Sequence, residues 1–209
     1  MASLVSYALT TLADVKENLG LDAGNTTKDN LIIRKINQAT EMIEGYCQLF
    51  KDHHFVEATY TQEEYDGTGI NQLILRMRPA TSLTSFQYRD TVQNQDSWTD
   101  VDSEQYFLDQ QAGVIDINYT LPKYWNRFRT TYVAGYSAAN MPSDLSEACA
   151  TLATFMVDNV QTGNAVKSKT EGARKLEYFQ ASDNASLIES LGLDESLDRY
   201  VDLPLIDDV

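Results

Sequence analysis

The feature that most constrains the fold of this chain is a change in the spacing of its apolar residues, which happens twice. Around residues 27–50 and again around 143–162, apolar side chains recur every three or four positions, as in a helix with one buried face. Between these stretches, residues 55–136 hold short runs in which apolar and polar residues alternate, as in strands with one buried face. The order predicts an α+β fold, a helical bundle core with an inserted antiparallel β-rich subdomain.

The helices also have clear starts and ends. Thr11 can cap a short helix over residues 11–19, with Asp14 three residues further on, and the helix over 27–50 follows a turn-rich stretch. The third helix, over 143–162, begins after Pro142, where Asp144 has Glu147 three residues later. Its apolar stripe is expected to pack on the helix over 27–50.

The central segment predicts about six short antiparallel strands. Asp66-Gly67 marks a hairpin turn, and the last strand is the most regular. In that strand one face holds Phe128, Thr130, Tyr132 and Ala134, and the other holds Arg127, Arg129, Thr131 and Val133. We therefore expect residues 1–163 to form a single domain. Residues 164–209 follow as a loop, a short strand over Lys175–Phe179 and an acidic docking tail.

The charge of the chain limits its partners. It carries 31 acidic against 16 basic residues among 209, a formal charge of −15, and such a field repels phosphate backbones and anionic membranes. No apolar run reaches the length of about 18 residues that a transmembrane helix needs. The opening stretch "MASLVSYALTTL" shows no export signal, so we expect a reducing compartment, with Cys47 and Cys149 as buried thiols and not a disulfide.

The residues that carry enzyme chemistry are sparse. Only two histidines occur, the neighbours His53 and His54, which would point to opposite sides of a strand and could not share one metal. There is no G-x-S-x-G nucleophile motif, and the many carboxylates single out no acid–base pair. The sequence favours a protein that is not an enzyme and needs no cofactor or metal, over a hydrolase with paired carboxylates.

Two aromatic features leave alternatives open. The stretch "KYWNRFR" mixes cations with aromatic rings as single-strand binders do, yet in so acidic a chain its arginines could equally pair with neighbouring carboxylates or line an interface with another acidic subunit. Trp98, Trp125 and 12 tyrosines motivate a second function, a tail-associated carbohydrate-binding or adhesive module.

Four stretches, taken in order, resemble the head–tail connector (adaptor, or head-completion) proteins of tailed bacteriophages. They are "LTTLADVKENLGLD", "DNLIIRKINQATEMIEGYCQ", "YVAGYSAANMPSDLSEACATLATFMVDN" and "VKSKTEGARKLEYF". That family commonly shows a short helix, an acidic loop, a helix rich in Ala and Ile, and a Tyr-x-x-Gly-Tyr strand end before a proline and a further helix. The β insert over 55–136 is larger than in compact adaptors and could serve another partner, such as a fibre or a capsid decoration.

The resemblance implies a structural protein of the virion neck, synthesised in the host bacterial cytoplasm. Its implied partners are the portal protein, a stopper or tail-completion protein, and further copies of itself in a ring, a dodecamer, through which DNA passes without specific binding; no membrane is involved. The tail from Ala185 is the implied portal-docking segment, which folds on binding. The candidate docking residues are Tyr200, Leu203, Leu205 and Ile206, and the candidate subunit-interface residues are Arg127, Arg129, Lys169, Arg174 and Tyr178.

Overall fold

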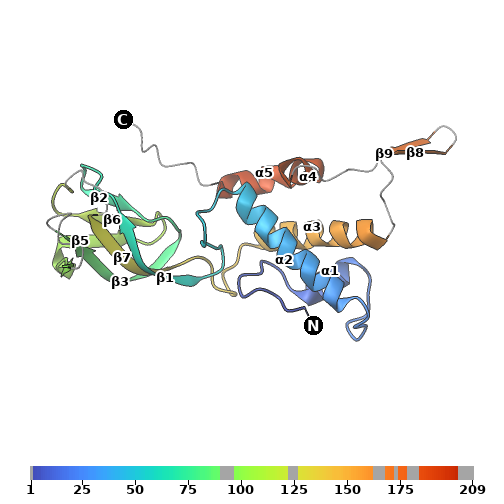
Figure 1. Cartoon of the computed structure of the whole chain (residues 1–209), viewed down its shortest axis with the longest axis horizontal. Coiled ribbons are helices and arrows are strands. Elements are labelled where there is room, and N and C mark those ends of the chain that lie inside the picture. Colours follow the sequence, from blue (N-terminus) through green and yellow to red (C-terminus); the bar gives the residue numbers. More distant parts are fainter. Residues whose placement is uncertain are drawn as a thin grey trace. The chain divides into compact units, whose positions relative to one another are not determined.

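The computed structural model describes residues 2–89, 97–121, 127–161, 168–171, 174–177 and 184–201, with the backbone alone for residues 161, 168–171, 174–177 and 184–186. The chain forms two compact units (Figure 1). Residues 1–49 and 141–209 make up a helical unit, and residues 50–140 make up a β unit. The predicted β-rich insert is thus a compact unit of its own, and the chain segments on either side of it fold together.

The helical unit begins with α1 (Leu12–Asn18), which has the predicted cap. Asp14 donates its backbone N–H to the Thr11 hydroxyl at 3.2 Å, and its carboxylate accepts the Thr11 backbone N–H at 3.1 Å. This reciprocal capping box satisfies two N–H groups that the first turn of a helix leaves without partners. Thr11 and Asp14 therefore set the start of α1.

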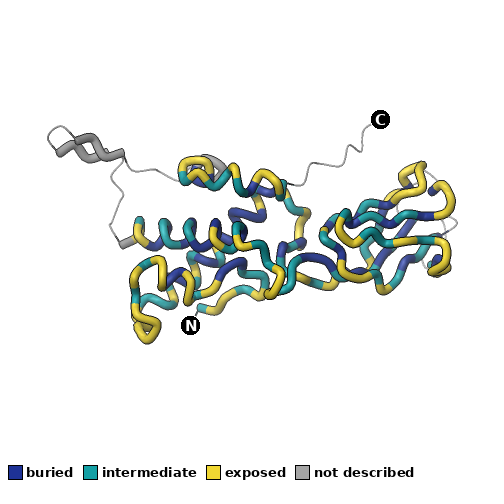
Figure 2. Tube along the Cα trace, turned by 180° about the vertical axis from the view of Figure 1, so that it is seen from behind, coloured by how far each residue is buried: buried dark blue, intermediate teal, exposed yellow. Residues whose placement is uncertain are grey.

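The two long helices, α2 (Asp29–Tyr46) and α3 (Ser143–Gln161), pack against each other as predicted. Their inner faces are fully or almost fully buried, and along both helices buried and exposed stretches alternate (Figure 2). The buried side chains include Ile32, Ile36, Ala39 and Ile43 of α2 and Leu145, Cys149, Leu152 and Met156 of α3. Cys47 and Cys149 are buried thiols that form no disulfide, as predicted.

The predicted helix over 27–50 ends earlier in the structure. Cys47 is its C-cap, and Gln48 takes a left-handed backbone conformation with φ of 58°. A left-handed residue directly after the cap turns the chain away from the helix axis. The apolar spacing continues as far as Phe50, but Phe50 is largely exposed and belongs to the β unit.

Two short helices and a turn that the sequence did not predict complete the helical unit. They are α4 (Asn184–Ser190), α5 (Asp194–Leu197) and the 3-10 turn η2 (Asp198–Tyr200). Leu187, Ile188 and Leu197 are buried, α4 contacts α2, and α5 contacts α3. The part of the expected docking tail that the structure describes, up to Val201, is therefore packed on the helices.

Between α3 and α4 lies a hairpin of β8 (Ser168–Glu171) and β9 (Arg174–Glu177). The two strands pair in antiparallel fashion, with Ser168 opposite Glu177. The sequence predicted a strand over Lys175–Phe179, close to β9, and read its partner as a loop.

The β unit contains two antiparallel sheets. In the larger sheet the order is β1 (Ala58–Tyr65), β7 (Phe128–Ala134), β3 (Ala80–Tyr88) and β4 (Thr99–Asp100). The smaller sheet consists of β2 (Gln72–Ile74), β6 (Val114–Ile117) and β5 (Tyr106–Asp109), and the 3-10 turn η1 (Ser103–Gln105) precedes β5. Phe86 of β3 meets Tyr106 of β5 edge to face, with ring centroids 5.4 Å apart, so aromatic side chains join the two sheets.

The alternation predicted for the last strand is confirmed. Every second residue of β7, from Phe128 to Ala134, is buried. Gly135 follows directly, with φ of +104°, and a Cβ atom there would lie 2.8 Å from the carbonyl oxygen of Phe55. Only glycine fits this position, because the backbone is in the left-handed region and a neighbouring segment is in contact.

The burial of the C-terminal helices makes a prediction about stability. Replacing Leu197, which is fully buried, with alanine should lower the free energy of unfolding by about 2–4 kcal/mol, because the change leaves a cavity. The matched control is Leu4→Ala, since Leu4 is 36% exposed and its loss should cost less than about 1 kcal/mol. Chemical denaturation of both variants measures the difference. Equal stability of Leu197→Ala and the wild type would mean that α5 is not part of the folded unit.

Candidate functional site

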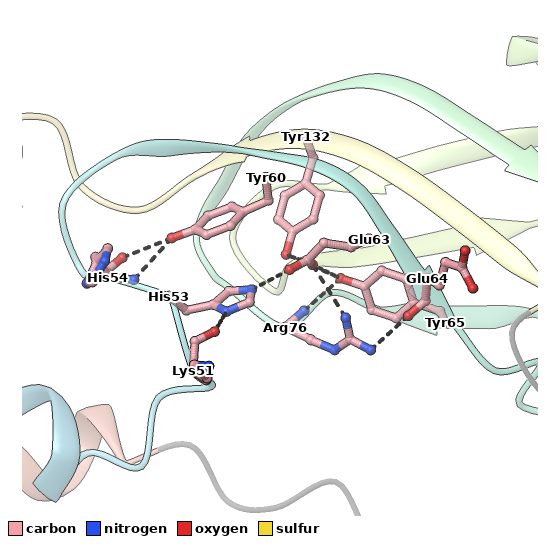
Figure 3. A network of polar contacts seen from close by, with 9 residues as sticks. All are labelled: Lys51, His53, His54, Tyr60, Glu63, Glu64, Tyr65, Arg76 and Tyr132. Carbon is pink, nitrogen blue, oxygen red and sulfur yellow. Dashed lines mark hydrogen bonds and ion pairs between the residues drawn. The ribbon is translucent and has the colours of Figure 1, made fainter.

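The most extensive buried polar network in the described part of the β unit is centred on the carboxylate of Glu63 in β1 (Figure 3). A β-bulge places it there. Gln62 has φ of 55°, and the pairing of β1 with β7 shifts register between Tyr60 and Glu63. Because a bulge adds one residue to the strand, Tyr60 and Tyr65 are both buried, and the Glu63 side chain is only 13% exposed.

Four side chains surround the Glu63 carboxylate. One of its oxygens accepts hydrogen bonds from the hydroxyl groups of Tyr65, at 2.7 Å, and Tyr132, at 2.8 Å. The other oxygen lies 2.7 Å from Nε2 of His53, and Arg76 lies 3.9 Å from the carboxylate. A buried carboxylate is tolerated only where such donors replace the water that it has lost.

The contacts around His53 favour its protonated form. Nδ1 lies 3.0 Å from the carbonyl oxygen of Lys51, and since a carbonyl can only accept, Nδ1 must carry a proton. Nε2 lies 2.7 Å from the Glu63 carboxylate, and the negative charge there favours the protonated, positively charged form of His53. Its ring stacks on Tyr60, with centroids 4.4 Å apart and an interplanar angle of 7°.

The surroundings of His53 and Glu63 shift both pKa values in the direction that favours the charged form of each group. Burial alone would lower the pKa of His53, but its contacts with Glu63 and with the Lys51 carbonyl outweigh burial and raise it above 6.5. Burial alone would raise the pKa of Glu63, but hydrogen bonds from His53, Tyr65 and Tyr132 lower it to about 2. Burial, followed by electrostatic interactions within the network, raises the pKa of both tyrosines.

Arg76 closes the network on one side. Its guanidinium group lies over the Tyr65 ring, 4.5 Å from the centroid, and donates a hydrogen bond of 2.7 Å to the backbone carbonyl of Glu64. The Arg76 backbone N–H donates to the Tyr65 hydroxyl at 3.2 Å. The segment after β2 is in this way attached to β1.

This network is suited to holding the unit together and not to catalysis. A carboxylate with a pKa of about 2 is a weak base, and tyrosines with raised pKa values are weak acids. Each of these groups is also occupied by another member of the network. Among the residues that the structure describes, no group of three His, Cys, Asp or Glu side chains could hold a metal ion.

The predicted interface arginines lie at one end of β7. Arg127 precedes the strand and donates its backbone N–H to the carbonyl of Tyr65. Arg129 donates from Nε to the Gln87 side chain at 2.8 Å and lies 4.5 Å from the centroid of the Trp98 ring. Trp98 is half-buried. From the sequence it is expected only as an aromatic side chain that could stack on a ligand.

The other predicted site residues lie elsewhere. Tyr200 is in the helical unit, where its hydroxyl donates to Asp144 of α3 at 2.8 Å and Arg199 pairs with the same carboxylate. Lys169 and Arg174 are in β8 and β9. Tyr178, Leu203, Leu205 and Ile206 lie outside the described residues. Arg127 and Arg129 therefore lie in the β unit, two residues apart in the chain, whereas Tyr200 and the hairpin belong to the helical unit.

Sequence reasoning missed the members of the Glu63 network. His53 was considered only for metal binding, and Glu63 was one of many carboxylates. The one available signal was the run of charged and aromatic residues in "TQEEYDG", where strict alternation breaks. The bulge at Gln62 explains that break.

Comparison with known proteins identifies the class. Residues 8–178 match the head completion protein family, HCP. This match agrees with a structural role. The chain belongs to this family, and it is a structural, non-enzymatic protein of the head–tail connector of a phage-like virion. This confirms the resemblance found in the sequence. No curated protein matches the chain.

Solved structures agree on the fold. The chain is similar to a protein in the neck of a native gene transfer agent (GTA) particle with C12 symmetry, with 17% identity, a TM-score of 0.52 and coverage of 100% of this chain and 98% of the other. It is also similar to one in the neck of an empty GTA particle with C6 symmetry, with 15% identity, a TM-score of 0.52 and coverage of 99% and 96%. A chain of a native GTA virion matches at 14% identity and a TM-score of 0.51, with coverage of 99% and 96%.

The comparisons offer no support for the carbohydrate-binding alternative. None of the helices within the described ranges is long and apolar enough to cross a membrane.

The His53–Glu63 pair predicts a pH dependence of stability. Because folding raises the pKa of His53, this group stabilises the fold fully below pH 6.5, and the stabilisation is lost as the pH rises through the pKa of His53 in the folded protein. Because folding lowers the pKa of Glu63, this group stabilises the fold above pH 4.5, and the stabilisation is lost as the pH falls toward 2. The pair should contribute most between these limits. At pH 5.5 the His53→Gln variant should lose about 2–4 kcal/mol of unfolding free energy, and the loss should shrink at alkaline pH.

Denaturant titrations of wild type and His53→Gln at several pH values test this, with His54→Gln as the matched control. His54 is half-buried and stands next to His53 in the chain. A loss that stays constant from pH 5.5 to alkaline pH would show that His53 is not charged in the folded protein.

The bulge makes a second prediction. Gln62→Val should destabilise the protein by about 1–3 kcal/mol, because a β-branched residue is strained at φ of 55°. Gln62→Gly should leave the stability within about 1 kcal/mol of wild type, since glycine adopts this φ freely. Thermal unfolding of the two variants compares them directly, and equal melting temperatures would argue against a left-handed residue at this position.

Proposed function

We propose that copies of this chain form a closed ring in the virion neck, below the portal, which continues the DNA channel and provides the attachment surface for a stopper or tail-completion protein. The observation that carries this proposal is the family match over residues 8–178. The similar chains in GTA necks with C12 and C6 symmetry support a ring, and a dodecamer is the state we propose for the virion.

The architecture supports a ring in physical terms. A ring needs a head-to-tail contact between two different surfaces of the same subunit, and the rotation between neighbours must close. A helical unit and a separate β unit provide chemically different surfaces. The residues proposed for the contact between subunits are Arg127, Arg129, Lys169, Arg174 and Tyr178.

The charge supports a channel through which DNA moves. With a formal charge of −15 per chain, a ring offers few cationic contacts that could release counterions from DNA, so phosphates are not held tightly. We therefore propose that DNA passes through without specific binding.

The portal contact is proposed for the end of the chain. Tyr200 is bound to Asp144 within the helical unit, so we propose that it anchors the start of the docking segment and does not itself enter the portal. Leu203, Leu205 and Ile206 are the proposed portal-binding side chains, because apolar anchors in an acidic segment suit docking into a groove.

The test is to add the purified chain to DNA-filled, tailless heads of the parent particle and to examine them by negative-stain electron microscopy. The expected result is a new ring of density at the portal vertex. The variant that lacks residues 202–209 should melt like the wild type but fail to attach. Folded wild-type protein that adds no density at the vertex would contradict the adaptor function, and attachment of the truncated variant would contradict the docking segment alone.

A further inference from the structure

Two arginine side chains lie against a single tryptophan at one end of the larger sheet. The Cζ atom of Arg89 lies 4.7 Å, and that of Arg129 4.5 Å, from the centroid of the Trp98 ring. Arg89 directly follows β3, Arg129 is in β7, and Trp98 directly precedes β4. We call these three residues the arginine–tryptophan cluster.

The charge of Arg89 is incompletely compensated within the described chain. Arg89 is only 6% exposed, and its Nε atom is buried without a hydrogen-bond partner. The carboxylate that pairs with it, that of Glu64, lies 3.7 Å from the guanidinium group and is itself 42% exposed. Burying a cation is unfavourable unless hydrogen bonds and charge pairing compensate for its lost hydration, and Glu64 compensates the charge of Arg89 only in part.

Unlike Arg89, Arg129 has no carboxylate partner among the residues that the structure describes. Glu64 is directly opposite Arg129 in the pairing of β1 with β7, but its carboxylate turns to Arg89. Arg129 makes one hydrogen bond, from Nε to Gln87, and no ion pair with any acidic residue that the structure describes. Gln87 in turn donates to the carboxylate of Asp100 at 2.7 Å, so that carboxylate is engaged with Gln87.

Of the two alternatives for the strand-face arginines, pairing with neighbouring acids is not seen for Arg129 among the described residues. This is unusual in a chain with 31 carboxylates and only 16 basic residues. Stacking on an indole ring holds a guanidinium group in place and leaves the N–H donors in its plane able to form hydrogen bonds. Two parallel N–H donors of this group match the two oxygens of a carboxylate.

We propose that the arginine–tryptophan cluster binds a carboxylate of an acidic side chain on a second copy of this chain. The inference rests on the proposed ring and names one contact within it. Copies that each carry a charge of −15 repel one another, so an interface that pairs cations with carboxylates reduces this cost and selects the register of neighbouring subunits. The same overall charge disfavours a DNA phosphate as the ligand.

The experiment compares wild type, Arg129→Gln and Arg34→Gln. Arg34 is exposed on α2, and its side chain donates to the backbone carbonyl of Asn30 in the same helix, so its replacement removes the same charge without touching the cluster. Self-association is measured by sedimentation velocity at low salt and at about 0.5 M salt, where screening shortens electrostatic interactions to a few ångströms. The same proteins are added to tailless heads and their rings are counted.

The expected result is that Arg129→Gln weakens self-association by about tenfold or more at low salt, whereas Arg34→Gln associates like the wild type. High salt should reduce the difference. Arg129→Lys, which keeps the charge but loses the fork, should be intermediate, and it provides the comparison if Arg129→Gln does not fold.

Three results would overturn the inference. One is equal association and equal ring formation by wild type and Arg129→Gln, which would leave the adaptor function intact. Another is binding of a short duplex DNA that depends on Arg129, which would make phosphate the ligand. The third is a wild type that neither self-associates nor forms rings on heads. A wild type that self-associates through Arg129 but does not bind heads would support the contact and contradict the adaptor function.

Discussion

The packing of the β unit depends on the buried carboxylate of Glu63, whose hydration in the unfolded chain is replaced by contacts with protein groups. The donors come from separate parts of the unit: His53 before the first strand, Tyr65 in β1, Tyr132 in β7, and Arg76 after β2. Removing one donor would leave a buried charge poorly compensated. The network therefore fixes the positions of these segments relative to one another. The bulge at Gln62 is part of this arrangement, because it turns the Glu63 side chain toward the interior of the unit.

A unit stabilised in this way is well suited to a structural role. Its polar groups are engaged with one another, and the perturbed pKa values come from mutual hydrogen bonding and burial, not from a cleft that awaits a substrate. Perturbed pKa values often mark active sites, but ion-pair networks that stabilise a fold produce them too. This agrees with the structural, non-enzymatic role of a head completion protein.

The sequence predicted what depends on local spacing and capping. The Thr11–Asp14 cap, the inner faces of α2 and α3 and the alternation in β7 all follow from short-range rules. It did not predict α4 and α5, because helices of seven and four residues are too short to show a helical period and owe their stability to packing on α2 and α3. The Glu63 network and the stacking of Trp98 with Arg89 and Arg129 join residues far apart in the chain, and no local pattern reports such contacts.

The most direct test of the account is a cryo-electron microscopy reconstruction of the neck of the parent particle. The account predicts a closed ring of identical copies of this chain around the DNA channel, in contact with the portal, with Arg129 of each copy next to a carboxylate of its neighbour. A neck without this chain, or with copies that do not contact one another, would contradict it.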